Sequence, residues 1–427
     1  MQITRRGIEI PKSMASLCRR ARDELTVAPL PTNAVPRPIR FTAYLDTPDA
    51  LVVPAHWPPA QGLGTDTRAP GHVMNHAFHG TLRDDLDQPA AVDATLASLR
   101  SKGGAVLSLA VGHGKTCCGL YIACALRAKT VIVVHKAFLA DQWAERIRQF
   151  VPTARVSFIR GATCDTSGDF VIAMIQTLLS RSYPVSTFAP FSMLLFDEAH
   201  HVAAKVFSQV MFSLNVPYTL GLTATPTRKD GLERLLHYFL GPVSYTKSLR
   251  AQSTVTVHIH KYTCAAYATP PPNNARGDVD YTRLMTALTL NADRTTRIAD
   301  LITADLEGRH VLVLSHRRKH LETLRTELLS RGVDAALYVG GIKDVPSSPV
   351  ILSTYAYVSE GFDEPRLDAL VLTTPASDVA QTVGRILRGN DPAKTPVIHD
   401  VVDQWSVCFA QAAKRRKQYL ASGFVLR

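Results

Sequence analysis

Two glycines, a lysine and a threonine lie close together in the stretch Ser108-Leu-Ala-Val-Gly-His-Gly-Lys-Thr116. The glycines let the backbone turn tightly enough to direct its N–H groups at an anion, and the helix expected after them adds the positive end of its dipole. Lys115 can neutralise the β- and γ-phosphates of a nucleoside triphosphate, and the Thr116 hydroxyl can ligate Mg²⁺. The stretch therefore predicts a phosphate-binding loop. Its expected cofactor contacts are Gly112, His113, Gly114, Lys115 and Thr116.

The loop departs from the full phosphate-loop pattern at one position. Leu109 occupies the place of the first glycine in that pattern. On these residues alone, an ordinary strand–turn–helix corner is the alternative. The choice between the two depends on residues further along the chain.

Two adjacent carboxylates, Asp197 and Glu198, follow the apolar run Met193–Phe196. At the carboxyl end of a buried strand beside a phosphate loop, Asp197 can hold Mg²⁺ through water and Glu198 can polarise the attacking water. A lone Asp-Glu pair would be read as an acidic turn. A phosphate loop precedes this pair, and the strands that separate the two motifs would make up one α/β domain. We therefore predict Lys115, Asp197 and Glu198 as catalytic residues. Thr116 and Asp197 are the predicted Mg²⁺ ligands.

Composition excludes several classes of protein. Of the 427 residues, 46% are hydrophobic and 20% are charged. No apolar run approaches the roughly 18 residues that a membrane span requires, and the first residues lack the apolar centre of a secretory signal. The seven cysteines show neither a Cys-x-x-Cys pair nor regular spacing. We therefore expect neither a zinc site nor disulfides, but reduced thiols in an intracellular compartment such as a cytosol or nucleus.

The positive charge is large and unevenly distributed. Lysine and arginine outnumber aspartate and glutamate by 48 to 36, which gives a formal net charge of +12. Residues 407–427 contain Lys414, Arg415, Arg416 and Lys417 in succession and no acidic residue. A surplus of this kind favours binding to a polyanion such as nucleic acid, with a merely solvated basic surface as the alternative.

Short apolar runs alternate with helix-like stretches through most of the chain, which is typical of parallel α/β sheets covered by helices on both faces. In the first half, the expected strands are Ala105–Leu109, Val131–His135, Arg155–Ile159, Phe170–Met174, Met193–Phe196 and Thr219–Leu222. In the second half, they are Val311–Ser315, Ala335–Tyr338, Val350–Thr354, Ala369–Thr373 and Val397–Val401. The pattern predicts two α/β domains in tandem.

Clusters of proline and glycine mark the expected boundaries between these parts. Residues 58–72 carry three prolines and three glycines and are predicted to be a linker. The predicted segments are a small N-terminal α+β module with this linker (1–79), a first α/β domain (80–248), a connecting segment (249–292), a second α/β domain (293–405) and a basic C-terminal helix (406–427).

In its order of motifs, the chain resembles the superfamily 2 helicases and translocases of the Asp-Glu-Ala-His type. The resemblance covers roughly residues 80–420. After the phosphate loop, its motifs are Asp197-Glu-Ala-His200, Gly221-Leu-Thr-Ala-Thr-Pro226, Val311-Leu-Val-Leu-Ser-His-Arg317, Ser353-Thr354 with Ser359-Glu-Gly-Phe-Asp363, and Gln381-Thr-Val-Gly-Arg-Ile-Leu-Arg388. The resemblance implies two RecA-like motor domains that hydrolyse ATP with Mg²⁺.

Finer features resemble the xeroderma pigmentosum B-type DNA helicases, and especially the compact helicases of large DNA viruses, including the poxvirus transcript-release type. These features are Arg228-Lys-Asp-Gly231, Tyr338-Val-Gly-Gly-Ile-Lys343 and the end Phe409…Lys-Arg-Arg-Lys-Gln-Tyr419. Lys229 departs from the human-type pattern, which has glutamate at this position. This subgroup implies DNA as the substrate and is compatible with a viral source.

Further roles are implied for residues of the second half. Arg385 and Arg388 share one helical face and would bring cations to the γ-phosphate, while Gln381 would orient the water. Thr223 and Thr225 would couple the carboxylate pair to the second domain. The alternative for Arg385 and Arg388 is that they cap an exposed helix. The alternative for the two threonines is that they cap a turn. The motif that ends at residue 363 adds two nucleotide contacts, Gly361 and Asp363.

Recognition of the base and of nucleic acid completes the prediction. Gln88, a loosely spaced match to a glutamine that the family places before the phosphate loop, is the expected base contact, and His113 is expected to face solvent. Nucleic acid should be held mainly through its phosphates. The candidate contacts are Lys136, Gln176, Thr177, Arg317 and Thr354, each with ordinary loop polarity as the alternative.

We therefore interpret the chain as an ATP-dependent nucleic-acid motor. A DNA helicase or translocase of transcription or repair is expected, with ATP and Mg²⁺ as cofactors, no membrane partner, and DNA favoured over RNA. One alternative is an RNA helicase of the Asp-Glu-Ala-His type, although the chain lacks the long C-terminal domains that those enzymes carry. Another is a nucleotide-gated clamp that holds DNA without unwinding it.

Overall fold

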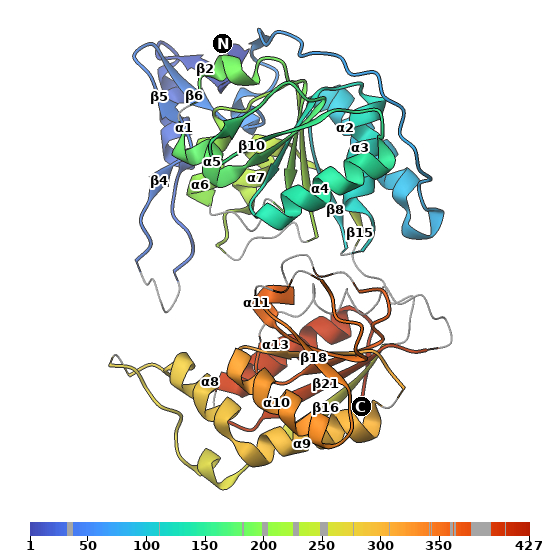
Figure 1. The fold of residues 1–427 in the computed structure, drawn as a ribbon. Coiled ribbons are helices and arrows are strands. Elements are labelled where there is room, and N and C mark those ends of the chain that lie inside the picture. The colour runs from blue at the N-terminus through green and yellow to red at the C-terminus, as the bar shows by residue number, and fades with distance from the viewer. Residues whose placement is uncertain are drawn as a thin grey trace. The chain divides into compact units, whose positions relative to one another are not determined.

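Two large parallel sheets organise the chain, one in residues Met1–Ser248 and one in Leu249–Arg427, which form separate compact units (Figure 1). The structure is a computed structural model. It describes all residues except 32–36, 111, 182, 199–203, 225–229, 248–254, 276, 307, 341, 343, 359–361, 363, 377–393 and 406. Two tandem α/β parts were predicted from the alternating pattern, and this fold class is confirmed.

The first unit contains an eight-stranded sheet in the order β11-β10-β12-β9-β13-β14-β8-β15. Neighbours pair in parallel, except that β11 is antiparallel to β10. The strands are β8 (Gly104–Leu109), β9 (Thr130–Val134), β10 (Val156–Arg160), β11 (Thr163–Cys164), β12 (Phe170–Met174), β13 (Met193–Asp197), β14 (Tyr218–Thr223) and β15 (Val243–Lys247). Four of them, β8, β9, β12 and β13, are buried at every residue, which explains their unbroken apolar runs. The predicted strands are confirmed, and β11 and β15 are additional edge strands.

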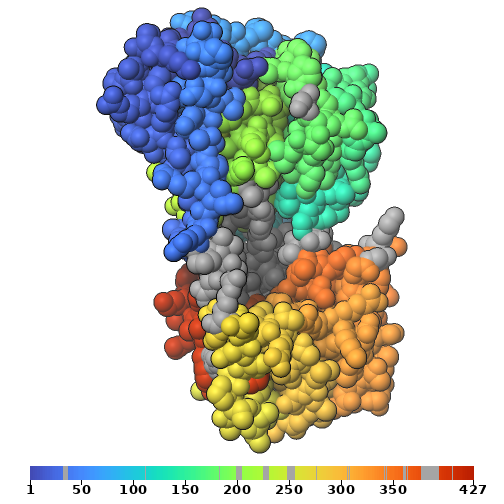
Figure 2. Space-filling model, turned by 90° about the vertical axis from the view of Figure 1, so that its left-hand side faces the viewer, coloured from blue at the N-terminus to red at the C-terminus, as the bar shows by residue number. Residues whose placement is uncertain are grey.

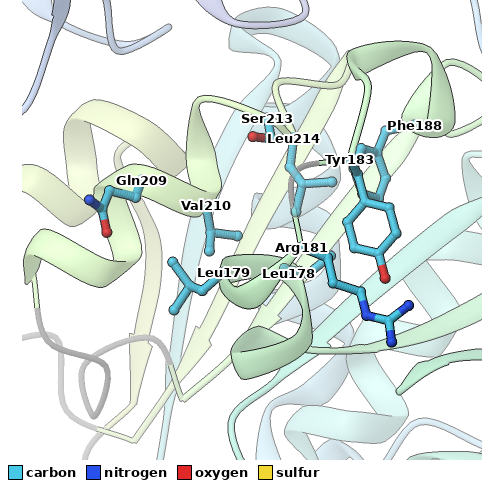
Figure 3. Close-up of a pocket in the computed structure, with 9 residues that line it drawn as sticks. All are labelled: Leu178, Leu179, Arg181, Tyr183, Phe188, Gln209, Val210, Ser213 and Leu214. Atoms are coloured by element: carbon cyan, nitrogen blue, oxygen red, sulfur yellow. The ribbon is translucent and has the colours of Figure 1, made fainter. Parts of the chain in front are cut away.

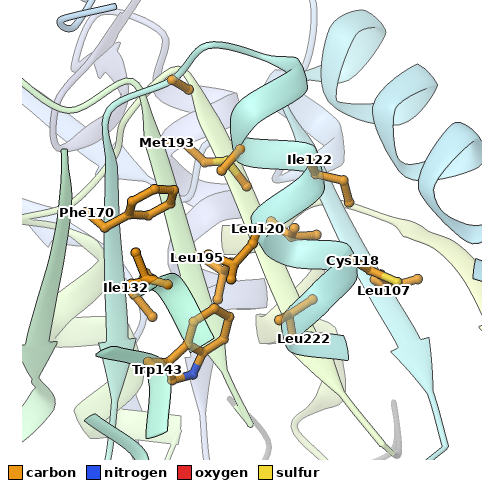
Figure 4. Packing of buried hydrophobic residues seen from close by; sticks show 14 of the residues in the cluster. Leu107, Cys118, Leu120, Ile122, Ile132, Trp143, Phe170, Met193, Leu195 and Leu222 are labelled. Carbon is orange, nitrogen blue, oxygen red and sulfur yellow. The ribbon is translucent and has the colours of Figure 1, made fainter. Parts of the chain in front are cut away.

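Helices cover both faces of this sheet. One face carries α2 (Gln88–Lys102), α3 (Lys115–Ala125) and α4 (Ala137–Phe150). The other carries α5 (Ile175–Ser180), α6 (Ala204–Met211) and α7 (Glu233–Leu240). On the first face, Cys118 and Leu120 of α3 and Trp143 of α4 pack with Leu195 and Leu222 of the sheet in one buried cluster (Figure 4). This packing fixes α3, and with it the phosphate loop, on the strand ends.

A small module of five strands and one helix precedes the sheet within the same unit. Its elements are β1 (Gln2–Thr4), β2 (Gly7–Pro11), α1 (Ala15–Leu25), β5 (Leu45–Asp46), β6 (Ala50–Val53) and β7 (Thr65–Asp66), with β3 (Thr26–Val27) and β4 (Phe41–Thr42) pairing beside them. Its core includes Ala204, Leu232 and Leu235 of the main domain, and the module lies directly on that domain (Figure 2). Arg5 reinforces the contact by donating hydrogen bonds to the carbonyl oxygens of Phe188, Ala189 and Phe191.

The segment 58–72, predicted as a linker, is instead part of this module. It contains the short helix η1 (Pro58–Ala60) and β7, and β7 pairs in parallel with β1. The proline and glycine content indicated a linker because it reports turns but not long-range strand pairing. The other segment boundaries stay predictions.

The second unit contains a seven-stranded, wholly parallel sheet in the order β18-β19-β17-β20-β21-β16-β22. Its strands are β16 (Thr256–Tyr262), β17 (Val311–Ser315), β18 (Ala335–Tyr338), β19 (Val350–Thr354), β20 (Ala369–Leu372), β21 (Val397–Asp403) and β22 (Val425–Leu426). Its helices are α8 (Tyr281–Leu290), α9 (Ala292–Asp305), α10 (Arg318–Ser330), α11 (Tyr355–Val358) and α13 (Val407–Ala421). β16 and α8 lie in the segment expected to connect the two domains, yet both belong to this unit. Among the described helices, none combines the length and apolar character needed to cross a lipid bilayer.

A buried ion pair anchors the basic C-terminal helix. Arg415 of α13 is 1% exposed and donates two hydrogen bonds to Asp400 of β21, at 2.8 and 2.7 Å. Asp400 also accepts from the Tyr419 hydroxyl, and Arg415 donates to the Ala376 carbonyl. The prediction that Arg415 contributes to a basic surface for nucleic acid is therefore wrong. Only Lys414, Arg416 and Lys417 of this run are exposed, because helical spacing turns one residue in four toward the sheet.

Removal of Arg415 should be costly for the second unit. We expect Arg415→Ala to lower the free energy of unfolding by about 3–5 kcal/mol, because Asp400 would be left buried without its cation. Arg416→Ala, on the exposed face of the same helix, should change it by less than about 0.5 kcal/mol. Urea unfolding of both variants measures the difference, and equal stabilities would contradict a structural role for the pair.

Buried histidines make the stability of the second unit depend on pH. His320 and His399 are 2% and 3% exposed, and burial lowers the pKa of each to about 3. The rings of His258 and His260 stack on His399, with centroids 5.0 and 5.1 Å away, and their charges lower the pKa of His399 further. A free histidine titrates near pH 6.5. Below that pH the unfolded chain therefore binds more protons than the folded chain, and stability falls as pH falls.

We expect the free energy of unfolding to decrease steadily from about pH 6.5 toward pH 4. His320→Gln removes one titrating group and should lower this slope by about 1.4 kcal/mol per pH unit. Urea unfolding at a series of pH values gives the slope. His79→Gln, a replacement of an exposed histidine, is the control and should leave the slope unchanged.

Candidate active site

Three neighbouring parallel strands, β13, β14 and β8, end side by side at the carboxyl edge of the first sheet. Asp197, the last residue of β13, lies opposite Leu222 of β14, and Thr223, the last residue of β14, lies opposite Ser108 of β8. The phosphate loop begins directly after β8. Parallel pairing therefore brings the carboxylate pair, Thr223 and the loop to one place, as the order of motifs predicts.

The loop adopts the backbone conformation that its glycines permit. Gly112 and Gly114 have φ angles of +87° and +74°, in the left-handed region. Gly114 is also the N-cap of α3, and no side chain caps the first turn of this helix. The first N–H groups of α3 are thus presented to an anion at the positive end of the helix dipole.

Lys115, the first residue of α3, turns back toward the strand ends. Its Nζ donates to the Leu109 carbonyl at 3.3 Å and lies 3.5 Å from Glu198 Oε1. Both side chains are largely enclosed, at 12% and 18% exposure. Lys115 and Glu198, predicted from separate motifs, are therefore in direct electrostatic contact.

Asp197 is a buried carboxylate with a defined partner. It is 7% exposed and accepts a hydrogen bond of 2.9 Å from the indole Nε1 of Trp143. Burial raises the pKa of Asp197, and the neighbouring charge of Glu198 raises it further, while the hydrogen bond from Trp143 and the charge of Lys115 lower it. A bound cation would stabilise the adjacent carboxylates of Asp197 and Glu198.

Glu198 leaves the strand through a strained backbone. Its φ angle is +49°, in the left-handed region that side chains other than glycine rarely adopt, and its N–H donates to the Leu222 carbonyl at 2.9 Å. Strain of this kind persists where the surrounding structure enforces it, commonly at functional sites. Here it turns Glu198 out of β13 toward Lys115.

Gln88, the expected base contact, forms a hydrogen bond to the backbone of the phosphate loop. Its side chain is 3% exposed, donates from Nε2 to the His113 carbonyl at 3.1 Å and accepts from the Arg83 N–H at 2.9 Å. A Cβ atom on Gly114 would lie 2.3 Å from Gln88 Nε2. The structure thus brings Gln88 to the loop, although it shows the carboxamide engaged with the loop backbone.

His113 does not simply face solvent, and this prediction was wrong. Its Nδ1 is buried and has no hydrogen-bond partner among the described residues. Burial lowers the pKa of His113, and the charges of Lys247 and Lys115 lower it further. The ring is therefore neutral and lies within the group of charges around the loop.

One cluster beside the loop was missed by sequence reasoning. Asp87, with a φ of +53°, forms an ion pair with Lys247 at 2.6 Å and accepts a hydrogen bond of 3.5 Å from the Tyr245 hydroxyl. The Lys247 carbonyl accepts from the Ala110 N–H at 3.0 Å, at the start of the loop. Lys247 and Tyr245 lie on edge strand β15, which no motif marks. Trp143 was also missed, because a tryptophan on an amphipathic helix is an ordinary core residue.

The predicted nucleic-acid contacts of the first unit lie at the same edge of the sheet. Lys136 and Gln176 follow β9 and β12, whose last residues Val134 and Met174 are register partners. Gln176 is exposed and donates to the His135 carbonyl at 2.7 Å. Thr177 is different, since it is 7% exposed and its hydroxyl accepts from the Gly161 N–H at 3.0 Å. Lys136 and Gln176 therefore fit a surface role better than Thr177 does.

The two contacts predicted in the second unit are also neighbours. Ser315, the last residue of β17, pairs in register with Thr354, the last residue of β19, and Arg317 follows two residues after Ser315. Arg317 donates to the Thr282 carbonyl at 3.1 Å, and the Thr354 hydroxyl accepts from the Tyr357 N–H at 3.2 Å. The remaining site predictions lie outside the described residues. These are Thr225, Gly361, Asp363, Gln381, Arg385 and Arg388.

A separate hollow of about 320 Å³ lies between α5 and α6, away from the phosphate loop. Leu178, Leu179, Val210 and Leu214 form its apolar walls, and Arg181 and Tyr183 lie at one side (Figure 3). Of the predicted nucleotide-site residues that the structure describes, none lines it.

The residues at the loop fit a nucleoside triphosphate with Mg²⁺. Three observations on this structure carry the fit: the uncapped N-terminus of α3, the enclosed Lys115 amine, and the adjacent carboxylates of buried Asp197 and largely enclosed Glu198. The described residues contain no cluster of three or more His, Cys, Asp or Glu side chains that could hold a metal. Mg²⁺ takes one or two protein oxygens and completes its shell with phosphates and water, so the Thr116 hydroxyl and Asp197 could hold it. Fold and site together fit the class of nucleotide-binding α/β proteins.

Comparison with known proteins makes this class more specific. Residues 82–228 match the family model described as "Type III restriction enzyme, res subunit". "Putative ATP-dependent RNA helicase L396" of Acanthamoeba polyphaga mimivirus is 28% identical, over 98% of this chain and 84% of its own length. "Putative helicase 161L" of Invertebrate iridescent virus 6 is 26% identical, over 83% and 84%. The crystal structure of T4 UvsW covers 79% of this chain and 75% of its own at 16% identity, with a TM-score of 0.34 that is too low to support an argument.

These similarities support a superfamily 2 helicase of the kind found in large DNA viruses. Its enzyme class is accordingly that of the ATP-dependent helicases, which use a nucleoside triphosphate and bind nucleic acid. The recognition made from the motifs is confirmed at this level.

The contact between Gly114 and Gln88 can be tested by a double-mutant cycle. Gly114→Ala should reduce nucleotide affinity at least about tenfold, because the added Cβ overlaps Gln88 Nε2 and the positive φ disfavours a side chain. Adding Gln88→Ala should recover part of the loss. Titration with a fluorescent ATP analogue measures both.

Gly161→Ala is the control for this cycle. Gly161 also has a positive φ, of +58°, but a Cβ there would meet no atom within 4 Å. It should leave nucleotide affinity unchanged. If Gly114→Ala bound nucleotide normally, the loop would not be the phosphate site.

Proposed function

We propose that this chain is a DNA helicase or translocase that couples Mg²⁺-dependent ATP hydrolysis to movement on, or opening of, duplex DNA. The observation that carries the proposal is the assembly of Lys115, Asp197 and Glu198 at one edge of the sheet, with Lys115 Nζ 3.5 Å from Glu198 Oε1. A lysine, a metal-binding carboxylate and a second carboxylate at an uncapped helix N-terminus are the groups that phosphoryl transfer to water requires.

Each group has a separate task in this proposal. The N–H groups of α3 and the Lys115 amine would bind the β- and γ-phosphates, and Lys115 would exchange its contacts with Leu109 and Glu198 for phosphate oxygens. Thr116 and Asp197 would hold Mg²⁺, which supplies charge neutralisation at the phosphates. Glu198 would accept a proton from the attacking water. Thr223, at the end of β14 beside Asp197, would couple the carboxylate pair to the second domain.

The roles of six further residues are proposed on the motif resemblance alone. Arg385 and Arg388 would stabilise the charge that develops on the γ-phosphate, and Gln381 would orient the water. Thr225, Gly361 and Asp363 would extend the coupling and nucleotide contacts.

DNA is favoured as the substrate by the resemblance to xeroderma pigmentosum B-type helicases. The exposed basic residues Lys414, Arg416 and Lys417 favour nucleic acid of either kind. The mimivirus relative is named as an RNA helicase, which makes RNA the second candidate. Lys136, Gln176, Arg317 and Thr354 would contact the phosphates of either polymer.

Glu198→Gln should separate nucleotide binding from hydrolysis. The amide keeps the size of the side chain but cannot accept the proton, so turnover should fall at least about a hundredfold while ATP affinity is retained. Steady-state hydrolysis and nucleotide titration on the same preparation provide the measurement. Near-normal turnover would show that Glu198 is not the water-activating carboxylate.

One assay tests the substrate assignment. Hydrolysis is measured with duplex DNA, single-stranded DNA and RNA, and strand displacement is followed in parallel on fluorescently labelled duplexes. We expect DNA to stimulate hydrolysis and to be displaced. Stimulation by RNA alone would establish the RNA enzyme, and DNA-stimulated hydrolysis with neither displacement nor translocation would identify a clamp.

A further inference from the structure

Three aromatic side chains meet at the carboxyl edge of the second sheet. Tyr281 is the first residue of α8, His316 follows β17, and Tyr355 follows β19. The ring centroids of Tyr281 and His316 lie 6.2 Å apart, and those of His316 and Tyr355 lie 4.6 Å apart. Parallel pairing brings the ends of β17 and β19 together, as the register pair of Ser315 and Thr354 shows. The three rings therefore form one cluster.

Hydrogen bonds hold each ring of this cluster in one orientation. The Tyr281 hydroxyl donates to the Pro375 carbonyl at 2.9 Å, and the Tyr355 hydroxyl donates to the Thr374 carbonyl at 2.8 Å. The Thr374 hydroxyl accepts from the His316 N–H at 3.0 Å and lies 2.9 Å from His316 Nδ1. Both partners follow β20, the strand next to β17. Because the rings are already fixed, little side-chain entropy is lost when a planar ligand stacks on them.

Two of the three rings are open to solvent. Tyr281 is 37% exposed and His316 is exposed as well, whereas Tyr355 is half-buried. Aromatic side chains are enriched at binding surfaces because a rigid ring supplies a large contact area at low entropic cost. The exposed rings of Tyr281 and His316 therefore offer aromatic surface to a ligand.

His316 offers this ligand an aromatic ring and not a charge. Its ring lies partly against Tyr355 and Thr374. Partial burial, with a smaller contribution from the charge of Arg317, lowers the pKa of His316 to about 4. The imidazole is therefore neutral near pH 7 and does not neutralise a phosphate. Stacking is the interaction that it can supply.

Cations lie beside the rings. Arg317 donates to the Thr282 carbonyl at 3.1 Å, which joins the start of α10 to the start of α8, and its Nε is enclosed without a hydrogen-bond partner among the described residues. Arg283 and Lys319 lie in the first turns of these two helices and are exposed. The Asp280 carboxylate is engaged as the N-cap of α8, where it accepts from the Arg283 N–H at 3.0 Å. Together these four side chains leave a positive balance of charge.

A planar, uncharged group that is joined to a phosphate chain matches both features of this surface. A nucleobase is such a group, and every base has a π-face that can stack on an aromatic ring. In an intact duplex the faces of each base are covered by its neighbours, so only an unstacked base can reach the rings. The surface therefore fits single-stranded nucleic acid better than duplex.

We propose that Tyr281 and His316 form a stacking platform for the unpaired bases of a single nucleic-acid strand. Arg317, Arg283 and Lys319 hold the phosphates of the same strand. This inference rests on the function proposed above and deepens it, because it names the single strand as the form of substrate that the second unit holds. Stacking tolerates every base, so the platform is compatible with movement along any sequence.

Abasic oligonucleotides test the stacking directly, because they keep the phosphates and lack the bases. A short fluorescein-labelled oligothymidine, its abasic counterpart and a duplex of the same length are titrated against the intact protein by fluorescence anisotropy. The titrations are made with and without a non-hydrolysable ATP analogue. We expect the abasic strand to bind at least about fivefold more weakly than oligothymidine, which is the loss of one stacked base. The duplex should also bind more weakly.

Matched variants locate the stacking. Tyr281→Leu and His316→Leu should each weaken the binding of oligothymidine at least about fivefold and leave the binding of the abasic strand unchanged. Tyr281→Phe keeps the ring and loses only the bond to Pro375, so it should bind both strands normally. Leu290→Ala, at the other end of α8 and 66% exposed, is the control for loss of an exposed apolar side chain. Lys319→Gln should weaken both strands alike and reduce the salt dependence of binding.

Photocrosslinking gives a second measurement that needs no variant to fold. Oligothymidine in which one base is replaced by 5-iodouracil is bound to the unaltered protein and irradiated, and the crosslinked peptides are identified by mass spectrometry. A halogenated base reacts with the ring on which it stacks, so we expect the crosslink at Tyr281 or His316. Urea unfolding of the leucine variants shows whether a loss of affinity reflects a loss of stability.

Two outcomes would overturn the platform and leave the proposed motor intact. One is equal affinity for oligothymidine and for the abasic strand. The other is a preference for oligothymidine that persists in folded Tyr281 and His316 variants, with crosslinks elsewhere in the chain. Tighter binding of duplex than of either single strand would assign the surface to duplex phosphates. A protein that binds none of these oligonucleotides, with or without the ATP analogue, would contradict the nucleic-acid function itself.

Discussion

Parallel pairing of β13, β14 and β8 is the constraint on which the candidate site depends. Parallel strands have their carboxyl ends at one edge of a sheet, so residues that follow different strands meet there. Asp197, Thr223 and the loop before Lys115 each follow one of these strands. The register pairs that join Asp197 to Leu222 and Thr223 to Ser108 set their separations. A shift of one residue in this pairing would move Asp197 away from the loop.

Packing behind the sheet holds this edge in position. Trp143 is part of the apolar core under α3 and α4, and its indole N–H is also the donor to Asp197. Gln88 supports the loop from α2 by binding both Arg83 and His113. The loop is therefore attached to the core by polar groups that are themselves buried. Such preorganised groups do not need to be reordered when a charged ligand arrives.

The two units use buried charge in different ways. In the second unit, Arg415 and Asp400 satisfy each other, so their charges serve the fold. In the first unit, Asp197 and Glu198 are like charges side by side, and burial together with the charge of Glu198 raises the pKa of Asp197. Like charges in a buried site favour the arrival of a cation. The contrast separates a structural ion pair from a site that is incomplete without a ligand.

The sequence by itself determined the strands, the order of the motifs and the class of protein, because buried parallel strands are unbroken apolar runs and phosphate binding needs glycine, lysine and threonine at fixed spacing. Only the tertiary structure decided which basic residues are free for a partner. Arg415 and Arg416 are adjacent in a basic run, yet one is buried against Asp400 and the other is exposed. It also decided the place of residues 58–72, where β7 joins β1, and of β16, which lies inside the second sheet. Pairing and burial of this kind depend on residues far away along the chain, and local composition does not report them.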